Sequence, residues 1–143
     1  MKIGIDIGRV IIGGEGEDTI FNEENYLLSP EVPGAYRAVS KLAKQRHELH
    51  IISKCGEVVE ERSMDWLDAE GFFYHILPHR VHFVRKRHLK SPMALALELD
   101  IFIDDRLDII DSMEQTVKNR ILFIDWEHAN RELEKIFDKA PEG

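Results

Sequence analysis

Short apolar runs alternate along this chain with longer stretches in which apolar positions recur at helical spacing. Several of the short runs are uninterrupted, such as Ile101–Ile103 and Ile121–Ile124, as is typical of strands that are covered on both faces. The alternation predicts an α/β fold, a doubly wound parallel sheet of about five strands flanked by helices. The expected strands are Lys2–Ile7, Glu48–Ser53, Phe73–Leu77, Asp100–Ile103 and Arg120–Ile124.

The apolar spacing between these runs predicts a helix after each strand. The first helix is expected to begin near Pro33, because proline suits an opening turn. Ser91 is expected to cap the N-terminus of the third helix, with Pro92 in its first position, and Gly71 to cap the C-terminus of the second. Asp125 is interpreted as the cap that opens the last helix. The expected ranges are about Pro33 to just before His47, Glu57–Glu70, Ser91–Leu99, Arg106–Asn119 and Glu127–Phe137.

Two stretches do not follow the alternation. Arg9–Glu31 is longer than an ordinary connection between a strand and a helix, and we expect a flap that contains a short hairpin. Pro78–Lys90 is rich in histidine and basic residues, which favours a basic loop, either simply solvated or attracting an anionic substrate. Asp138–Gly143 is expected to be a frayed tail. The apolar residues of the predicted hairpin are Ile11, Ile12, Ile20 and Phe21.

The length of 143 residues predicts a single domain over residues 1–143. Because 43% of the residues are hydrophobic and 32% are charged, the chain is expected to fold around an apolar core. No apolar stretch approaches the roughly 18 residues of a membrane span, so no membrane insertion is expected. Asp6 interrupts an N-terminal apolar run that is too short for a secretory signal, and the protein is expected to be cytoplasmic. The net charge of -8 argues against general binding to nucleic acid.

The histidines and the single cysteine carry weaker signals. On a helix, His75, His79 and His82 would line one face and could hold zinc, but Pro78 would break that helix. Cys55 cannot form an internal disulfide, and it has no evident base to activate it as a nucleophile.

Polar residues follow the apolar runs where each strand is expected to end. The first run ends at Asp6, the second at Ser53-Lys54, and the fourth at Asp104-Asp105. Ligands bind beyond the carboxyl ends of strands in open parallel sheets, so these residues are candidates for one shared site. Carboxylates that meet there repel one another and need a cation. Mg²⁺ is the natural choice, because it prefers carboxylate, water and phosphate oxygens.

At these positions the chain resembles the haloacid dehalogenase superfamily of phosphohydrolases, whose members have a Rossmann-like fold. The resemblance rests on four motifs in the family's order: the strand ending in Asp6, the strand ending in Ser53, Lys90, and the acidic pair Asp104-Asp105. It covers nearly the whole chain. It implies a Mg²⁺-dependent phosphatase, with an aspartyl-phosphate formed on Asp6.

The resemblance also implies how a phosphorylated substrate is held. Asp6 would attack the phosphorus, while Ser53 and Lys90 would hold the oxygens of the transferred group. Lys54 and Arg9 are the further residues expected to contact the substrate.

The metal-binding residues include one departure from the family. The resemblance assigns Mg²⁺ to Asp6, Asp104 and the backbone carbonyl of Gly8, with Asp105 supporting the ion or binding it through water. Most phosphatases of the family carry a second aspartate, an acid and base for proton transfer, at the position of Gly8. The alternative is therefore an impaired relative that binds a phosphorylated ligand or a protein partner. Replacement acids in the expected flap would be Glu15, Glu17 or Asp18.

The chain length bears on access to the expected site. Most relatives of this type use further residues for a cap over the site. This chain has only the Arg9–Glu31 insertion, so no large cap is expected. An open site would suit a bulky phosphoester, or a homo-oligomer in which a neighbouring subunit closes it.

Overall fold

The computed structural model describes residues 1–14 and 25–140, which form a sheet of five strands with helices on both faces. The strand order is β3-β2-β1-β4-β5, and every neighbouring pair is parallel. The predicted doubly wound α/β fold is confirmed. The strands are β1 (Lys2–Ile5), β2 (Glu48–Lys54), β3 (Val81–Val84), β4 (Ile101–Asp104) and β5 (Asn119–Leu122).

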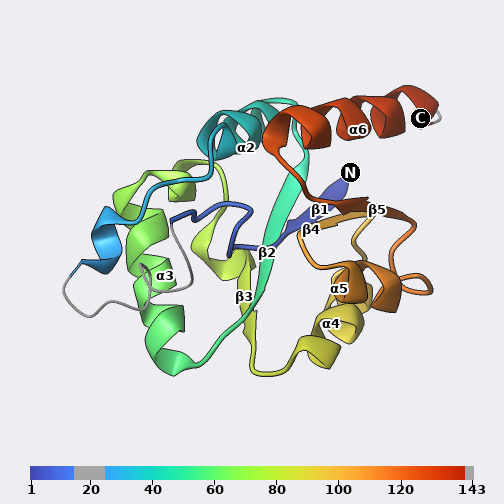
Figure 1. Ribbon diagram of the computed structural model, residues 1–143. Helices are drawn as coiled ribbons and strands as arrows, with labels where there is room; N and C mark the ends of the chain where they lie inside the picture. Colours follow the sequence, from blue (N-terminus) through green and yellow to red (C-terminus); the bar gives the residue numbers. More distant parts are fainter. Residues whose placement is uncertain (15–24, 141–143) are drawn as a thin grey trace.

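Two layers of helices enclose the sheet (Figure 1). One apolar core joins the sheet to α2, α3 and α6, and a second joins its other face to α4 and α5. The helices are α2 (Ala35–Lys44), α3 (Glu57–Ala69), α4 (Lys90–Ala96), α5 (Leu107–Ser112) and α6 (Trp126–Lys139). Short 3-10 turns, η1 to η4, cover Tyr26–Leu28, Phe72–Tyr74, Pro78–Arg80 and Arg87–Leu89. Within the described residues, none of the helices has the length and apolar character needed to cross a membrane.

The central strands β1 and β4 are the most deeply buried. Ile3, Ile5 and the Ile101–Ile103 segment have no exposed surface. A Cβ atom at Gly4 would lie 2.5 Å from Cδ1 of Leu99 and 2.6 Å from Cδ1 of Phe102, so only glycine allows this close packing. The central strands therefore form a rigid base for the residues at their carboxyl ends.

The prediction of the third strand was wrong. Phe73–Leu77 forms a 3-10 turn and its continuation, in which Phe72 and Ile76 are buried four residues apart while Tyr74 is 87% exposed. This spacing suits a helical turn. The third strand is β3, which lies inside the stretch that was expected to be a basic loop. β3 is an edge strand, so its residues need no continuous apolar run.

Three helix ends also differ from their predictions. α4 begins at Lys90, and the Ser91 hydroxyl bonds to the Ser112 carbonyl and to Thr116 instead of capping the helix. α5 is shorter than the predicted helix, which extended to Asn119. α6 continues through Lys139, so the start of the predicted tail is helical. The predicted cap at Asp125 is confirmed, because its Oδ1 accepts a 2.7 Å hydrogen bond from the backbone N–H of His128.

The described ends of the predicted flap are attached to the fold. Val10, Ile11 and Ile12 are buried. Two buried indoles donate 2.8 Å hydrogen bonds to backbone carbonyls of this segment, from Trp126 to Val10 and from Trp66 to Ser29. Ile12 forms isolated bridges with Gly8 and Glu31. The predicted partners Ile20 and Phe21, and the acids Glu15, Glu17 and Asp18, lie outside the described residues.

Candidate active site

The strand order reverses at the centre of the sheet. The chain proceeds from β1 outward to β2 and β3, then crosses to β4 and β5 on the other side of β1. Clefts form beyond the carboxyl ends of strands at such a reversal. Asp6 follows β1 and Asp104 ends β4, and the backbone N–H of Asp6 bonds to the Ile103 carbonyl at 3.0 Å. The fold thus places both acids side by side at this point.

Lys90 joins these two aspartates. Its Nζ donates a 3.0 Å hydrogen bond to Oδ1 of Asp6 and a 2.8 Å hydrogen bond to Oδ2 of Asp104. The three side chains are buried, and Oδ1 of Asp104 accepts a 3.0 Å hydrogen bond from the backbone N–H of Arg106. Buried charges are tolerated when they are paired and hydrogen-bonded in this way. The network therefore fixes both carboxylates in position.

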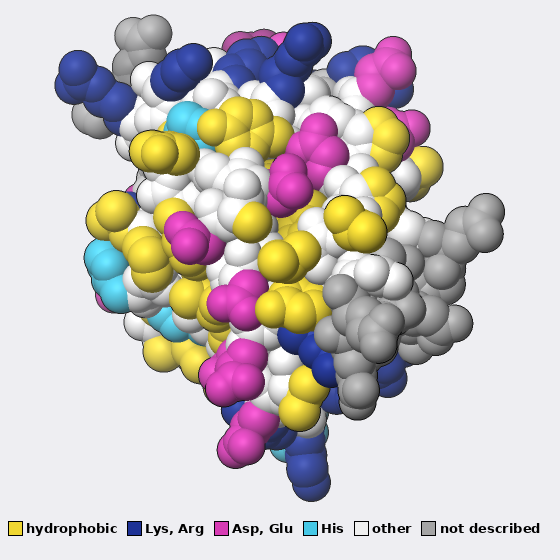
Figure 2. All heavy atoms as spheres, turned by 90° about the vertical axis from the view of Figure 1, so that its left-hand side faces the viewer, with side chains coloured by type: hydrophobic (Ala, Val, Ile, Leu, Met, Phe, Trp, Pro, Cys, Tyr) yellow, Lys and Arg dark blue, Asp and Glu magenta, His cyan; other side chains and the backbone are white. Residues whose placement is uncertain are grey.

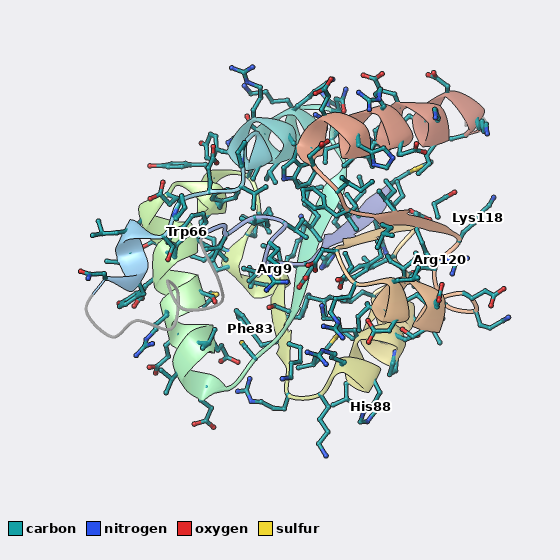
Figure 3. The ribbon with its side chains drawn as sticks, viewed as in Figure 1. Arg9, Trp66, Phe83, His88, Lys118 and Arg120 are labelled. Carbon is teal, nitrogen blue, oxygen red and sulfur yellow. The ribbon has the colours of Figure 1, made fainter. Side chains whose placement is uncertain are left out.

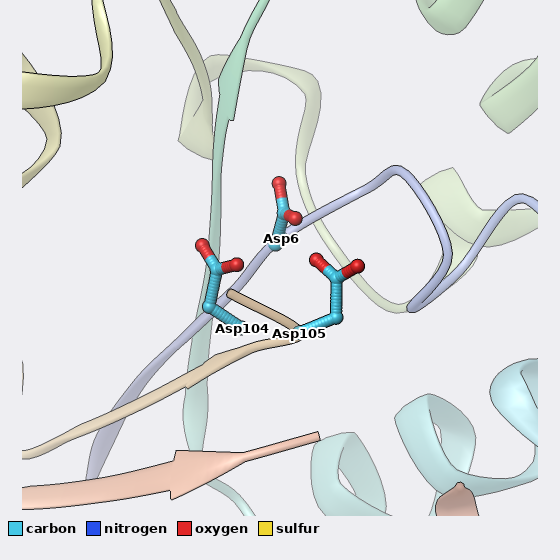
Figure 4. A group of neighbouring side chains, drawn as sticks. All are labelled: Asp6, Asp104 and Asp105. Atoms are coloured by element: carbon cyan, nitrogen blue, oxygen red, sulfur yellow. The ribbon is translucent and has the colours of Figure 1, made fainter. Parts of the chain in front are cut away.

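Asp105 completes a group of three carboxylates, which we call the aspartate cluster: Asp6, Asp104 and Asp105 (Figure 4). Each offers one oxygen atom, and these atoms lie within 4.8 Å of one another. Around an octahedral Mg²⁺ ion, ligand oxygens are about 2.9 Å apart when adjacent and about 4.2 Å apart when opposite. The three carboxylate oxygens lie close to this range, and carboxylate oxygens are the ligands that a hard divalent cation prefers.

The electrostatics of the cluster agree with this fit. Burial raises the pKa of Asp6 to about 7 against the attraction of Lys90, and the charges of Asp104 and Asp105 add to the rise. Burial and Asp104 likewise raise the pKa of Asp105. Burial disfavours the charged form of Lys90, but the two carboxylates outweigh it and raise its pKa. One ammonium group thus faces three carboxyl groups, and a divalent cation would offset the excess negative charge.

A cavity of about 620 Å³ lies in front of Asp6. Seven of the eight residues predicted for the site line it, and the eighth, Asp104, is fully buried beneath it. Arg9 has a backbone φ of 63°, a left-handed conformation that is costly for a residue with a side chain. In Figure 3 its side chain lies between α3 and α5, two helices that also line the cavity. The seven are Asp6, Gly8, Arg9, Ser53, Lys54, Lys90 and Asp105.

Three charged residues that line the cavity were not predicted from the sequence. Arg87 lies three residues before Lys90, in a stretch that was only described as basic. Arg106 and Asp108 form an ion pair at the start of α5, with atoms 3.0 and 3.1 Å apart. The only sequence signal for this pair was its position directly after Asp104-Asp105.

The alternative uses of histidine and cysteine find no support. His82 lies on β3 and its ring contacts that of His50, with Nε2 and Nδ1 3.2 Å apart. Among the described residues, the aspartate cluster is the only group of metal-ligating side chains close enough to hold an ion. Cys55 lines the cavity but is mostly buried, and burial raises the pKa of its thiol to about 11. It is therefore poorly suited to act as a nucleophile at neutral pH.

Comparison with known proteins gives a partial sequence match. No family model matches the chain. A protein of Oceanobacillus iheyensis named "Putative nucleotidase OB0422" is 28% identical over 101 residues. The match covers 70% of this chain and 52% of that protein, so the chain spans about half the length of the curated relative.

Solved structures give closer agreement over the whole fold. A hydrolase from Streptococcus pneumoniae TIGR4 has a TM-score of 0.67 at 10% identity, over 93% of this chain and 97% of its own. The class C acid phosphatase from Bacillus anthracis has a TM-score of 0.63 at 11% identity, and the match covers 99% of this chain and 80% of the phosphatase chain. The chain therefore shares the fold of these hydrolases, in agreement with the resemblance to the haloacid dehalogenase superfamily. These proteins are named as a hydrolase, a phosphatase and a nucleotidase.

Proposed function

We propose that this protein is a Mg²⁺-dependent phosphoester hydrolase in which Asp6 is the nucleophile. The observation that supports this most strongly is the placement of Asp6, which lies at the base of the cavity and is bonded to Lys90 beside Asp104. A buried carboxylate held in one position can attack a bound phosphorus in line. The likeness to a class C acid phosphatase favours the same chemistry.

In the proposed reaction, a carboxylate oxygen of Asp6 attacks the phosphorus, and the bond from phosphorus to the leaving oxygen breaks. Because Gly8 supplies no acid, the leaving oxygen takes its proton from solvent water. Water then attacks the phosphorus of the aspartyl-phosphate, which releases inorganic phosphate and the free Asp6 carboxylate. Lys90 positions Oδ1 of Asp6 and places a positive charge beside the phosphate oxygens, and the Ser53 hydroxyl donates a hydrogen bond to them. Lys54 and Arg9 reach the bound ester from the edge of the cavity.

The aspartate cluster and the Gly8 carbonyl would hold the metal. When bound, Mg²⁺ offsets the repulsion between the attacking carboxylate and the phosphate dianion. It also lowers the pKa of the carboxyl groups that bind it, which favours the ionised Asp6 that the attack requires.

A second candidate function is binding of a phosphorylated ligand or a partner without turnover. Gly8 favours it, because a side chain that could transfer a proton is missing directly beside the nucleophile. A positioned acid or base typically contributes about 10²- to 10⁴-fold to the rate, so turnover would be slow without a substitute.

An aryl phosphate assay with Mg²⁺ or with a chelator separates the two functions. The hydrolase proposal predicts Mg²⁺-dependent turnover that is lost in Asp6→Asn. Asp100→Asn is a matched control, because Asp100 lies at the opposite end of β4 and accepts a hydrogen bond from the backbone of Lys2. Equal background rates in the wild type and Asp6→Asn would refute the hydrolase and leave the binding function. The name of the curated relative makes nucleoside monophosphates a second set of substrates to test.

A further inference from the structure

The charges that line the cavity differ in sign from those of the whole protein. The chain has 27 acidic and 19 basic residues. The cavity is lined by five basic residues, Arg9, Lys54, Arg87, Lys90 and Arg106, and by three acidic ones, Asp6, Asp105 and Asp108. Figure 2 instead shows a line of acidic side chains on the face that α3 occupies. The exposed acidic residues of α3 include Glu57, Glu61, Asp65 and Asp68. With Asp104 beneath the cavity included, basic residues still outnumber acidic ones by five to four, and a cation bound at the aspartate cluster would add to this balance. The cavity therefore favours anions more than the rest of the surface does.

These charges lie at two depths. Asp6, Ser53 and Lys90 are buried, with 7%, 7% and 3% of their surface exposed, and they form the floor of the cavity. Lys54 and Arg87 are exposed side chains that line the same cavity, and we call them the rim cations. An ester whose phosphate lies on the floor would extend its leaving group toward the rim.

Within the part of the chain that is described, the side chains of the rim cations make no hydrogen bond and no ion pair. The charge of Arg87 does act on Asp108, whose pKa it helps to lower after the larger effect of Arg106. Lys90 is engaged by two carboxylates, and Arg106 by a two-point contact with Asp108. The negative charge of Asp108 is thus already matched. Arg9 also has an interaction within the chain. Lys54 and Arg87 are therefore the two basic residues of this lining whose side chains are best placed to bind a further anionic group.

We propose that the substrate is a small phosphomonoester with a second anionic group, a phosphate or a carboxylate, on its leaving group, and that Lys54 and Arg87 bind that second group. This inference rests on the proposed function for the place of the first phosphate. Arginine and lysine are the usual ligands for such groups, arginine through paired hydrogen bonds and lysine as a point charge. The cavity volume of about 620 Å³ lies within the range of small-molecule sites.

The test compares alkyl phosphates with the same esters carrying a terminal phosphonate, which adds the second charge but cannot itself be hydrolysed as an ester. We expect the wild type to prefer the phosphonate-bearing ester by about tenfold in kcat/KM, a typical worth of one charge-assisted contact. Arg87→Gln is expected to remove most of this preference, and Lys54→Gln part of it. Added salt should reduce the preference, because the rim is exposed to solvent.

Lys86→Gln is the matched control, because Lys86 is the exposed neighbour of Arg87 and does not line the cavity. It should keep the wild-type ratio of the two kcat/KM values. A wild type that hydrolyses both esters equally would overturn the second-anion site and leave the proposed function standing. If neither ester is hydrolysed, calorimetric titration with both esters still tests the site. Tighter binding of the phosphonate-bearing ester that depends on Arg87 would then support it, and equal binding would overturn it.

Discussion

Gly8→Asp is predicted to install the proton-transfer group that this cavity lacks. A Cβ atom at Gly8 would meet no heavy atom within 4 Å, and the backbone there is not in the left-handed region, so an aspartate fits without strain. Gly8 lines the cavity next to Asp6. Like charges of the aspartate cluster would raise the pKa of the new carboxyl, which favours the protonated form that an acid catalyst needs.

The size of the effect depends on the leaving group. A positioned acid contributes about 10²- to 10⁴-fold, equivalent to about 2.7 to 5.5 kcal/mol of barrier. Because Gly8 is exposed to solvent, the gain should lie near the lower end, about 10²-fold in kcat/KM for an alkyl phosphate. A nitrophenyl phosphate, whose leaving group needs little protonation, should gain much less. The assay is therefore the ratio of kcat/KM for the two esters.

Two control variants accompany this measurement. Gly8→Asn has nearly the same size but no proton to transfer, and it should leave the ratio unchanged. Gly56→Asp adds the same charge at another glycine with open space around its Cβ position, at the start of α3 and outside the cavity lining. An equal gain for both esters, or no gain in a folded Gly8→Asp variant, would refute the interpretation that a missing acid limits the enzyme.

Three further predictions concern single residues. Lys90→Met leaves two buried carboxylates without their cation and should lower the free energy of unfolding by about 3 kcal/mol in a urea titration, whereas an unchanged midpoint would contradict the buried network. Cys55 should react with iodoacetamide about 100-fold more slowly at pH 8 than an ordinary thiol, because its pKa is about 11 against an ordinary 9.0, and a free-thiol rate would contradict its burial. Arg9→Gly should relieve a left-handed backbone, raising stability by about 0.5 to 1 kcal/mol while lowering kcat/KM. Glu98→Gly is the control, because Glu98 has a φ of 57° and lies outside the cavity lining. It should raise the stability by a similar amount and keep the wild-type kcat/KM. An equal loss of kcat/KM in both variants would contradict a role for the Arg9 side chain.

Much of the fold was predictable because buried parallel strands need continuous apolar runs. Ile101–Ile103 satisfies this requirement, and its strand was placed within one residue. The run Ile121–Ile124 is not covered on both faces as expected, because β5 is an edge strand in which only Ile121 is buried, and Ile124 lies beyond its end and is exposed. The edge strand β3 does not need such a run, because His82 and its neighbours Val81 and Phe83 are only half-buried. The aromatic residues around Phe72 are apolar enough for a strand, but they pack as a helical turn.

The end of α5 was mispredicted for a related reason. Ile109, Met113 and Val117 are all buried at a spacing of four residues, although the helix stops at Ser112. The apolar pattern continues through the turn that follows, because those side chains still face the same core. Periodicity therefore reports which residues face the core, and backbone geometry decides where the helix ends.

The floor of the site was predictable because the carboxyl ends of parallel strands must meet at one edge. Asp6, Ser53 and Asp104 follow from this rule alone. Arg87 could not be selected, because it is one of several basic residues in a connection, and only the folded chain shows which of them reaches the cavity. The Arg106–Asp108 ion pair could not be selected either, because only the folded chain shows that it lines the cavity.

The most direct test of the proposed mechanism is a search for a phosphorylated Asp6. Wild-type protein is mixed with Mg²⁺ and a radiolabelled phosphate ester, quenched in acid, and digested for peptide mapping. The ester is a nitrophenyl phosphate, because its leaving group departs without an acid while Gly8 offers no base to activate water, so the aspartyl-phosphate should form faster than it is hydrolysed and accumulate. The proposal predicts label on the peptide that contains Asp6, dependent on Mg²⁺, released by hydroxylamine and missing from Asp6→Asn. Label on another peptide, or wild-type turnover in Asp6→Asn, would contradict it.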